Sequence, residues 1–314
     1  MGLRDAAAGH LWTIAGTLWP AAAPPSEPWS CTVPAPWGRV RIDGRITHVP
    51  GASSIAIIVH GFAGSHRSGS VQRTAQACSA VGISSLRVSL RGADACGEDI
   101  YHAGLVEEVH AAIDSPEVAA YDDVVLIGHS LGGHVALNAA RTHAPKLRAV
   151  AAIGTPLDLS VGCASIDRLR STGYREHILL TLRRIYRAFL ARHPDQAPAD
   201  LRVVERVRTI RAWDEHVVIK RHGFDSVDDY HVSQSVAPHL HALTVPALYL
   251  GSAQDPMVPY QTVEPILQRA PSSVEVHIVD GGGHVVFPRS VNLGLPAGAG
   301  ADAQVLAWLG RQTR

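Results

Sequence analysis

Residues 124–137 read VVLIGHSLGGHVAL, and this stretch decides what the chain folds into. Its apolar, β-branched first half predicts a buried strand, and its second half predicts a short helix. Gly128 and Gly132 stand two residues before and two after Ser130, where small residues let a strand and a helix pack around a very tight turn. Such a turn lifts the Ser130 hydroxyl out of the sheet and aims the Leu131 N–H at a developing oxyanion. We therefore interpret Ser130 as a candidate nucleophile; the alternative is a bystander serine in a glycine-rich turn.

The composition is that of a folded globular protein with a sizeable core. The chain has 314 residues, of which 46% are hydrophobic and 18% charged, enough for one large α/β domain or two small ones. The formal net charge is +0, so no overall field attracts nucleic acid or an acidic surface. No apolar run reaches the length of a membrane-spanning helix. We therefore expect neither a nucleic-acid partner nor an integral membrane segment, and the oligomeric state stays open.

The cysteines indicate neither a disulfide framework nor a metal site, because no two of them are closely spaced. They are Cys31, Cys78, Cys96 and Cys163. We expect reduced, mostly buried thiols, no metal and no organic cofactor. The first 19 residues share an apolar stretch with signal peptides, but Asp5 and His10 interrupt it and Arg4 alone supplies positive charge. We therefore expect a cytoplasmic protein.

Apolar runs alternate with amphipathic stretches on both sides of the serine turn. The predicted strands include 55–59, 83–90, 147–153, 245–250 and 274–279, and the predicted helices between and after them include 71–80, 105–113, 262–268 and 303–309. This alternation predicts an α/β fold with a mostly parallel central sheet and helices on both faces. The dipeptide Asp43-Gly44, between alternating segments at 39–42 and 45–49, predicts the turn of a β-hairpin.

The strand–helix alternation stops between residues 157 and 240. This stretch is helical in its periodicity and rich in arginine, most clearly at 178–190. Because it lies between two predicted sheet strands, we interpret it as a helical cap over the carboxyl ends of the strands, where ligands bind in such folds. The predicted core is then 1–156 together with 241–314, and its first 30 residues form an N-terminal extension.

A serine hydroxyl becomes a nucleophile only when a base takes its proton and a third group orients that base. His284 follows three glycines after the last predicted strand, so we expect it to be the base. Asp255 follows the strand at 245–250 and is the favoured orienting acid. The alternative is Asp280, which lies four residues before His284 and would have to fold back on its own loop. We predict that Ser130, Asp255 and His284 act together.

The loop after the strand at 55–59 reads HGFAGS and is expected to supply a second oxyanion donor. We predict the backbone N–H of Phe62 for this role, beside that of Leu131. Residues next to these donors are candidates for binding substrate: His60, Gly61 and His129. His102 could line the same pocket, although a buried, hydrogen-bonded histidine is an equally good interpretation.

A family resemblance extends beyond the three candidate catalytic residues. Matching segments are His60-Gly61-x-x-Gly64-Ser65, Leu90-Arg91-Gly92, Ile100-Tyr101-His102-Ala103-Gly104, Arg211-Ala212-Trp213-Asp214, Gly223 to His231, Gly281 to Phe287 and His10-Leu11-Trp12-Thr13. Together with the serine turn they resemble the YheT-like branch of the α/β-hydrolase superfamily, also called hydrolase family four. The resemblance covers nearly the whole chain. Val286 stands where that family usually has glycine, and the stretch after Arg91-Gly92 is short, so the differences concern the entrance of the site.

The resemblance implies an α/β-hydrolase fold and a serine carboxylic-ester hydrolase that acts on small-molecule acyl esters or lipids through an acyl-enzyme. One alternative is transfer of the acyl group to an alcohol, because the same chemistry serves both reactions. Another is a binding protein that kept the fold without turnover. The intact set of candidate residues favours catalysis over binding alone.

Overall fold

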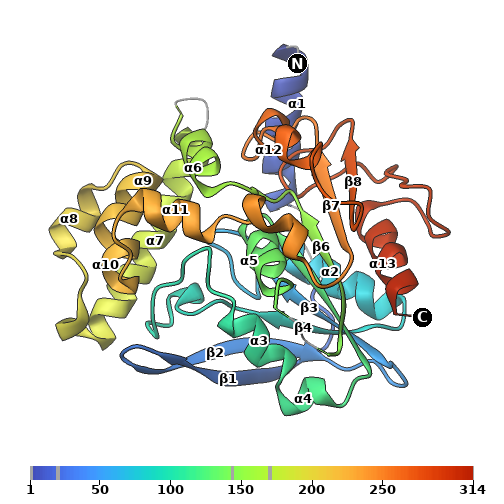
Figure 1. The fold of residues 1–314 in the computed structure, drawn as a ribbon, viewed down its shortest axis with the longest axis horizontal. Helices are drawn as coiled ribbons and strands as arrows, with labels where there is room; N and C mark the ends of the chain where they lie inside the picture. Colours follow the sequence, from blue (N-terminus) through green and yellow to red (C-terminus); the bar gives the residue numbers. More distant parts are fainter. Residues whose placement is uncertain (1–2, 19–21, 143–144, 169–171, 314) are drawn as a thin grey trace.

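The computed structural model describes residues 3–18, 22–142, 145–168 and 172–313. Its strands form one eight-stranded sheet in the order β1-β2-β4-β3-β5-β6-β7-β8. The pairs β1–β2 and β2–β4 are antiparallel, and the other neighbouring pairs are parallel. Figure 1 shows helices on both sides of this sheet. The predicted α/β fold with a mostly parallel sheet is confirmed.

The strands are β1 Glu27–Ala35, β2 Gly38–Thr47, β3 Ser54–Val59, β4 Ser84–Val88, β5 Asp123–His129, β6 Leu147–Ile153, β7 Ala247–Ser252 and β8 Val274–Val279. The helices around them are α1 Leu3–Leu18, α2 Gly69–Ala80, η1 Ala93–Ala95, α3 Glu107–Ile113, α4 Pro116–Ala119, α5 Leu131–Ala139, α12 Tyr260–Leu267 and α13 Ala301–Gln312. The strands predicted at 147–153 and 274–279 have the predicted bounds. The other predicted core elements named above lie within three residues of the observed ones, the hairpin excepted.

The central strands are apolar throughout because both faces of the sheet are covered. In β3, Ile55, Ile57 and Val59 face the larger core cluster, on the side of α3 and α5. Ala56 and Ile58 face the opposite way, into a second cluster with α2 and α13. Successive side chains of a strand point to opposite sides of a sheet, so a strand buried on both faces reads as one continuous apolar run.

The hairpin predicted at Asp43-Gly44 is wrong. Strand β2 runs straight through these residues, and the turn to β1 lies at residues 36 and 37. Gly44 pairs with Val88 of β4, and a Cβ atom added there would lie 2.6 Å from the carbonyl oxygen of Arg87. The glycine therefore serves close approach of two backbones, which a local turn pattern does not distinguish from a hairpin.

The described residues between β6 and β7 form helices and no strand, as predicted for this stretch. They are α6 Leu159–Asp167, α7 Thr172–Arg192, η3 Pro194–Gln196, α8 Leu201–Arg206, α9 Ile210–Trp213, the π-helical turn η4 Asp214–Val218, α10 Ile219–His222, α11 Val227–Gln234 and η5 Ala237–Ala242. Figure 1 shows α7 to α11 gathered to one side of the sheet. The boundaries of the cap at 157 and 240 remain a prediction. None of the described helices combines the length and apolar character needed to cross a bilayer.

Candidate active site

Ser130 occupies a strained turn between β5 and α5. Its backbone has φ 53° and ψ −122°, a conformation that residues other than glycine rarely adopt. The turn is held by the Ser130 N–H, which donates to the carbonyl of Ile153 at 2.8 Å. Because α5 begins at Leu131, the serine stands at the positive end of the helix dipole. The strain and this placement are those expected of a nucleophile turn.

Glycines make the turn possible. A Cβ atom at Gly128 would overlap the backbone of Gly132 and Gly133, and one at Gly132 would overlap the carbonyl oxygen of Val59. At Gly61, in the loop after β3, an added Cβ atom would lie 3.1 Å from Cβ of Ser130. The spacing of glycines around Ser130 therefore has a steric cause, since β3, β5 and α5 approach one another at this point.

Asp255 and His284 form a buried hydrogen-bonded pair. Nδ1–H of His284 donates to Oδ2 of Asp255 at 2.9 Å and lies 3.2 Å from Oδ1. Oδ1 also accepts from the backbone N–H groups of Met257 and Val258, at 2.8 and 2.9 Å. These bonds fix the carboxylate on the turn after β7. The alternative acid, Asp280, is exposed, and the structure places Asp255 against His284.

In the described part of the chain, no hydrogen bond joins the Ser130 hydroxyl to another side chain, His284 included. Serine–histidine contacts are often long in unliganded sites and shorten when substrate binds. The histidine–carboxylate half of the arrangement is therefore assembled, and the serine–histidine half is open.

The N-terminal helix α1 supports the loop of His284, a contact that sequence reasoning missed. The N–H of His284 donates to Oγ1 of Thr13 at 2.8 Å, and this hydroxyl donates to the carbonyl of Gly9 at 2.8 Å. In the same loop, Gly281 and Gly282 have φ of 94° and 92°. The only sequence signal was the family-like segment His10 to Thr13, which carried no indication of its partner.

The loop after β3 lies against the serine turn and is held by hydrogen bonds of His60. His60 has two partners: the N–H of Leu90 donates to its Nε2 at 3.0 Å, and its Nδ1–H donates to the carbonyl of Gly61 at 2.7 Å. Since the carbonyl and N–H of one trans peptide point in opposite directions, this bond turns the N–H of Phe62 away from His60. Among the residues that the structure describes, the N–H groups of Phe62 and Leu131 have no acceptor.

Tyr101 fixes the next peptide of this loop. Its hydroxyl accepts from the N–H of Ala63 at 2.7 Å, and Ala63 has the unusual φ of 57°. The ring lies edge-on to those of His60 and Phe62, with centroids 6.1 Å apart in both cases. Burial raises the pKa of Tyr101, so the hydroxyl stays protonated. In the sequence, the only sign of this role is that Tyr101 lies in the family-like segment 100–104.

The histidines predicted to bind substrate lie in different surroundings. Burial lowers the pKa of His60 to about 4 and that of His129 to about 3, so both are neutral. His129 donates to Oγ1 of Thr74 at 3.1 Å, on the α2 side, and neither His60 nor His129 borders the pocket above Ser130. We therefore assign them to shaping the loops. His102 does border this pocket, and burial holds its pKa well below the usual range.

A largely apolar pocket lies between the serine turn and the helices of the stretch between β6 and β7. Ser130, Phe62 and Leu131 lie at its floor, and side chains from the cap, including Leu159 and Trp213, complete its wall. Tyr230 also borders the pocket, and its hydroxyl stays uncharged because burial raises its pKa well above the usual value. The pocket can hold an apolar chain next to the nucleophile candidate.

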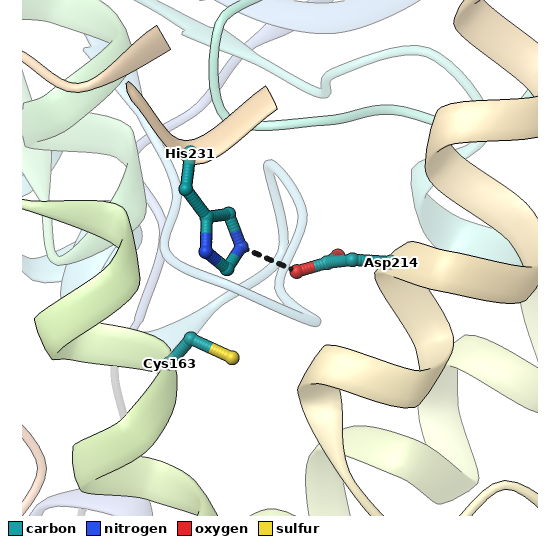
Figure 2. A group of neighbouring side chains, drawn as sticks. All are labelled: Cys163, Asp214 and His231. Carbon is teal, nitrogen blue, oxygen red and sulfur yellow. Dashed lines mark hydrogen bonds and ion pairs between the residues drawn. The ribbon is translucent and has the colours of Figure 1, made fainter. Parts of the chain in front are cut away.

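The polar side chains that border this pocket include a group of three: Cys163, Asp214 and His231. One ligand atom from each lies within 4.8 Å of the others, and Figure 2 shows them facing a common space. Burial raises the pKa of Asp214, opposed by its bond to His231, and burial together with Asp214 and Asp167 raises that of the Cys163 thiol. The sequence spacing gave no sign of this group, because the three residues come from separate helices.

The chain combines a mostly parallel sheet, a serine on a strained strand–helix turn, a buried histidine–carboxylate pair and a helical stretch between two strands. Together these features define an α/β-hydrolase fold. The chain belongs to the alpha/beta hydrolase family, whose sequence model matches residues 56–291. It is similar to "Putative esterase YheT" of Escherichia coli (strain K12), with 26% identity over 239 residues, 74% of this chain and 69% of YheT. The predicted resemblance to YheT-like proteins is thereby confirmed.

Shorter matches point the same way. "Putative esterase slr0264" of Synechocystis sp. is 33% identical over 137 residues, 40% of this chain and 37% of that protein. Human "Phospholipase ABHD3" is 26% identical over 100 residues, 32% of this chain and 24% of that protein. These relatives support a hydrolase function of the esterase kind.

Solved structures show the fold. The esterase Pf2001 of Pyrococcus furiosus has a TM-score of 0.54 and 15% identity, covering 85% of this chain and 90% of its own. The α/β-hydrolase GrgF from Penicillium sp. has a TM-score of 0.54 and 19% identity, covering 83% of this chain and 91% of its own. At such low identity the likeness concerns architecture alone.

Proposed function

We propose that the protein is a serine carboxylic-ester hydrolase in which Ser130 is the nucleophile, His284 the base and Asp255 the orienting acid. The observation that carries the proposal is the buried hydrogen bond of 2.9 Å between His284 and Asp255, on loops beside the strained turn of Ser130. A carboxylate on Nδ1–H leaves Nε2 as the free, basic nitrogen of the imidazole, which is the state a general base needs.

The reaction proceeds through an acyl-enzyme. Nε2 of His284 takes the hydroxyl proton as Oγ of Ser130 attacks the ester carbonyl, and the resulting oxyanion accepts from the N–H groups of Phe62 and Leu131. The imidazolium then gives its proton to the leaving alcohol oxygen as the carbon–oxygen bond breaks. Water, deprotonated by the same imidazole, attacks the acyl-enzyme, and Ser130 leaves with the proton.

The pocket favours esters with an apolar acyl chain. Its wall is mostly hydrocarbon, so each buried methylene of a chain contributes about 0.8 kcal/mol to binding. Relatives with esterase and phospholipase names agree with an acyl ester or lipid as substrate. The absence of a recorded acceptor for the Phe62 and Leu131 N–H groups among the described residues supports their role as donors to the oxyanion.

The test combines fluorophosphonate labelling, located by mass spectrometry, with hydrolysis of p-nitrophenyl esters of increasing chain length. We expect the label on Ser130 and turnover in the wild type, and loss of both in Ser130→Ala. Ser233→Ala, at an exposed position on α11, is the matched control and retains both. Turnover that survives in Ser130→Ala would contradict the proposal. Product analysis with added glycerol separates hydrolysis, which gives free acid, from acyl transfer, which gives a new ester.

A further inference from the structure

Cys163, Asp214 and His231 bring three metal-ligating atoms together in the roof of the pocket. Cys163 lies on α6, Asp214 begins the π-helical turn η4, and His231 lies on α11. Figure 2 shows the imidazole, the carboxylate and the thiol turned toward one another from these separate elements. Short π-helical turns are rare and occur often at functional sites. The convergence therefore calls for an explanation beyond packing of the cap.

The spacing of the three atoms is near that of a metal site. Nε2 of His231 and Oδ2 of Asp214 are 2.9 Å apart, and the sulfur completes a group whose members lie within 4.8 Å of one another. Ligand atoms on one tetrahedral zinc ion lie about 3.3–3.6 Å apart, given the usual zinc–ligand bond lengths. To bind an ion in this group, the Cys163 thiol leaves its contact with Oδ2 of Asp167, to which it donates at 3.7 Å.

The group is buried and incompletely paired. His231 and Asp214 are 2% and 5% exposed, and Nδ1 of His231 has no hydrogen-bond partner among the described residues. Arg211, on the neighbouring helix α9, is turned to Asp228 at the surface, 2.9 Å away. Among the described residues, Asp214 has His231 as its ionisable partner and no lysine or arginine, and a carboxylate is costly to bury without a cation. The arrangement is therefore suited to a cationic ligand.

We propose that Cys163, Asp214 and His231 bind a transition-metal ion of the zinc class, with a fourth coordination position open to the pocket above Ser130. Sulfur, imidazole and carboxylate together match zinc and cobalt, whereas magnesium and calcium require oxygen ligands. On binding, the ion displaces the thiol proton to solvent, and the imidazole proton moves from Nε2 to Nδ1. One thiolate and one carboxylate then balance the dication, so the complex is neutral in its apolar surroundings.

A bound ion obstructs the pocket. All three ligands border the space that Ser130 also borders, so the ion and its fourth ligand occupy volume that an acyl chain needs. Zinc is therefore expected to act as an inhibitor that competes with substrate. This consequence rests on the proposed ester hydrolysis, whereas binding of the metal does not.

Cobalt titration of the full chain tests the site directly. We expect the wild type to bind one equivalent of Co²⁺ with a thiolate-to-cobalt charge-transfer band, which zinc displaces and magnesium does not. Cys163→Ser removes the band, and His231→Gln weakens binding by about tenfold or more. Cys96→Ser, at an exposed thiol, is the matched control and keeps the band. Circular dichroism establishes that each variant is folded.

Two results would overturn the site: a wild-type protein without the band, or a band of full intensity in Cys163→Ser. If Cys163→Ser does not fold, Asp214→Asn and His231→Gln take its place, and unchanged cobalt affinity in both would be equally damaging. Ester hydrolysis by the wild type that zinc leaves untouched while cobalt binds would refute obstruction of the pocket. Absence of hydrolysis in every sample bears on the proposed function and leaves the spectroscopic result intact.

Discussion

Replacing Tyr101 by phenylalanine is expected to slow turnover while leaving substrate binding nearly unchanged. The Tyr101 hydroxyl accepts from the N–H of Ala63 at 2.7 Å and so holds the peptide that follows the predicted oxyanion donor, Phe62. Phenylalanine keeps the ring and its edge-on contacts with His60 and Phe62. The substitution therefore removes one hydrogen bond and little else.

The magnitude follows from the N–H group left behind. A fully buried donor without a partner costs about 1–3 kcal/mol, which sets an upper range for the half-buried N–H of Ala63. Ala63 can recover this free energy only if the loop leaves the arrangement with φ 57°, which moves the N–H of Phe62. If the whole cost lowers the fraction of molecules in which the loop has its catalytic conformation, kcat falls by about 5- to 150-fold. The upper end lies near the cost of deleting one oxyanion donor, about 10²–10³.

The assay is steady-state hydrolysis of a p-nitrophenyl ester, with kcat and KM determined separately and the free energy of unfolding measured in urea. Tyr186→Phe is the control, because its hydroxyl also accepts a backbone N–H, that of Ala199 at 3.1 Å, and in addition donates to the carbonyl of Ala199. We expect Tyr186→Phe to lose at least as much stability as Tyr101→Phe, and Tyr101→Phe alone to lose kcat. A Tyr101→Phe enzyme with wild-type kcat and reduced stability would refute the reasoning.

Three further predictions concern Asp255, Thr13 and two buried histidines. Asp255→Asn is expected to lower kcat by about 10⁴-fold because the imidazole loses its orienting acceptor, whereas Asp280→Asn leaves ester turnover unchanged; equal effects would contradict the assignment. Thr13→Val removes the acceptor of the His284 N–H, so kcat should fall by about tenfold with KM retained, and an unaltered kcat would show that α1 does not position the loop. Stability should fall as the pH drops from 6.5 toward 4. The folded pKa of His60 is about 4 and that of His129 about 3, below the value of about 6.5 in unfolded chains, so the unfolded state binds more protons in this range. Each histidine lowers the free energy of unfolding by about 2 kcal/mol at pH 5, which urea unfolding can measure. His129→Gln should remove the contribution of His129. A His129→Gln variant with the wild-type pH dependence would show that His129 is not a source of the effect.

Short-range patterns in the sequence are sufficient to predict part of the fold and part of the site. The stretch 124–137 predicted a strand, a turn and a helix, and these are β5, Ser130 and α5. Glycine at 128 and 132 carried the signal, because no other residue fits where backbones nearly touch. Chain order predicted that Asp255 and His284 follow the last strands, and the structure brings them together at 2.9 Å.

Which distant segments meet depends on the packing of the whole chain. Gly44 looked like a turn residue because its flanks alternate, but its neighbour is Arg87 on another strand. Thr13 contacts His284 across 271 positions of sequence, and Tyr101 reaches Ala63 from another loop. Cys163 and His231 converge because cap helices pack around an apolar pocket. Local periodicity reports how one element folds, whereas these contacts depend on how elements separated by long stretches of chain pack against each other.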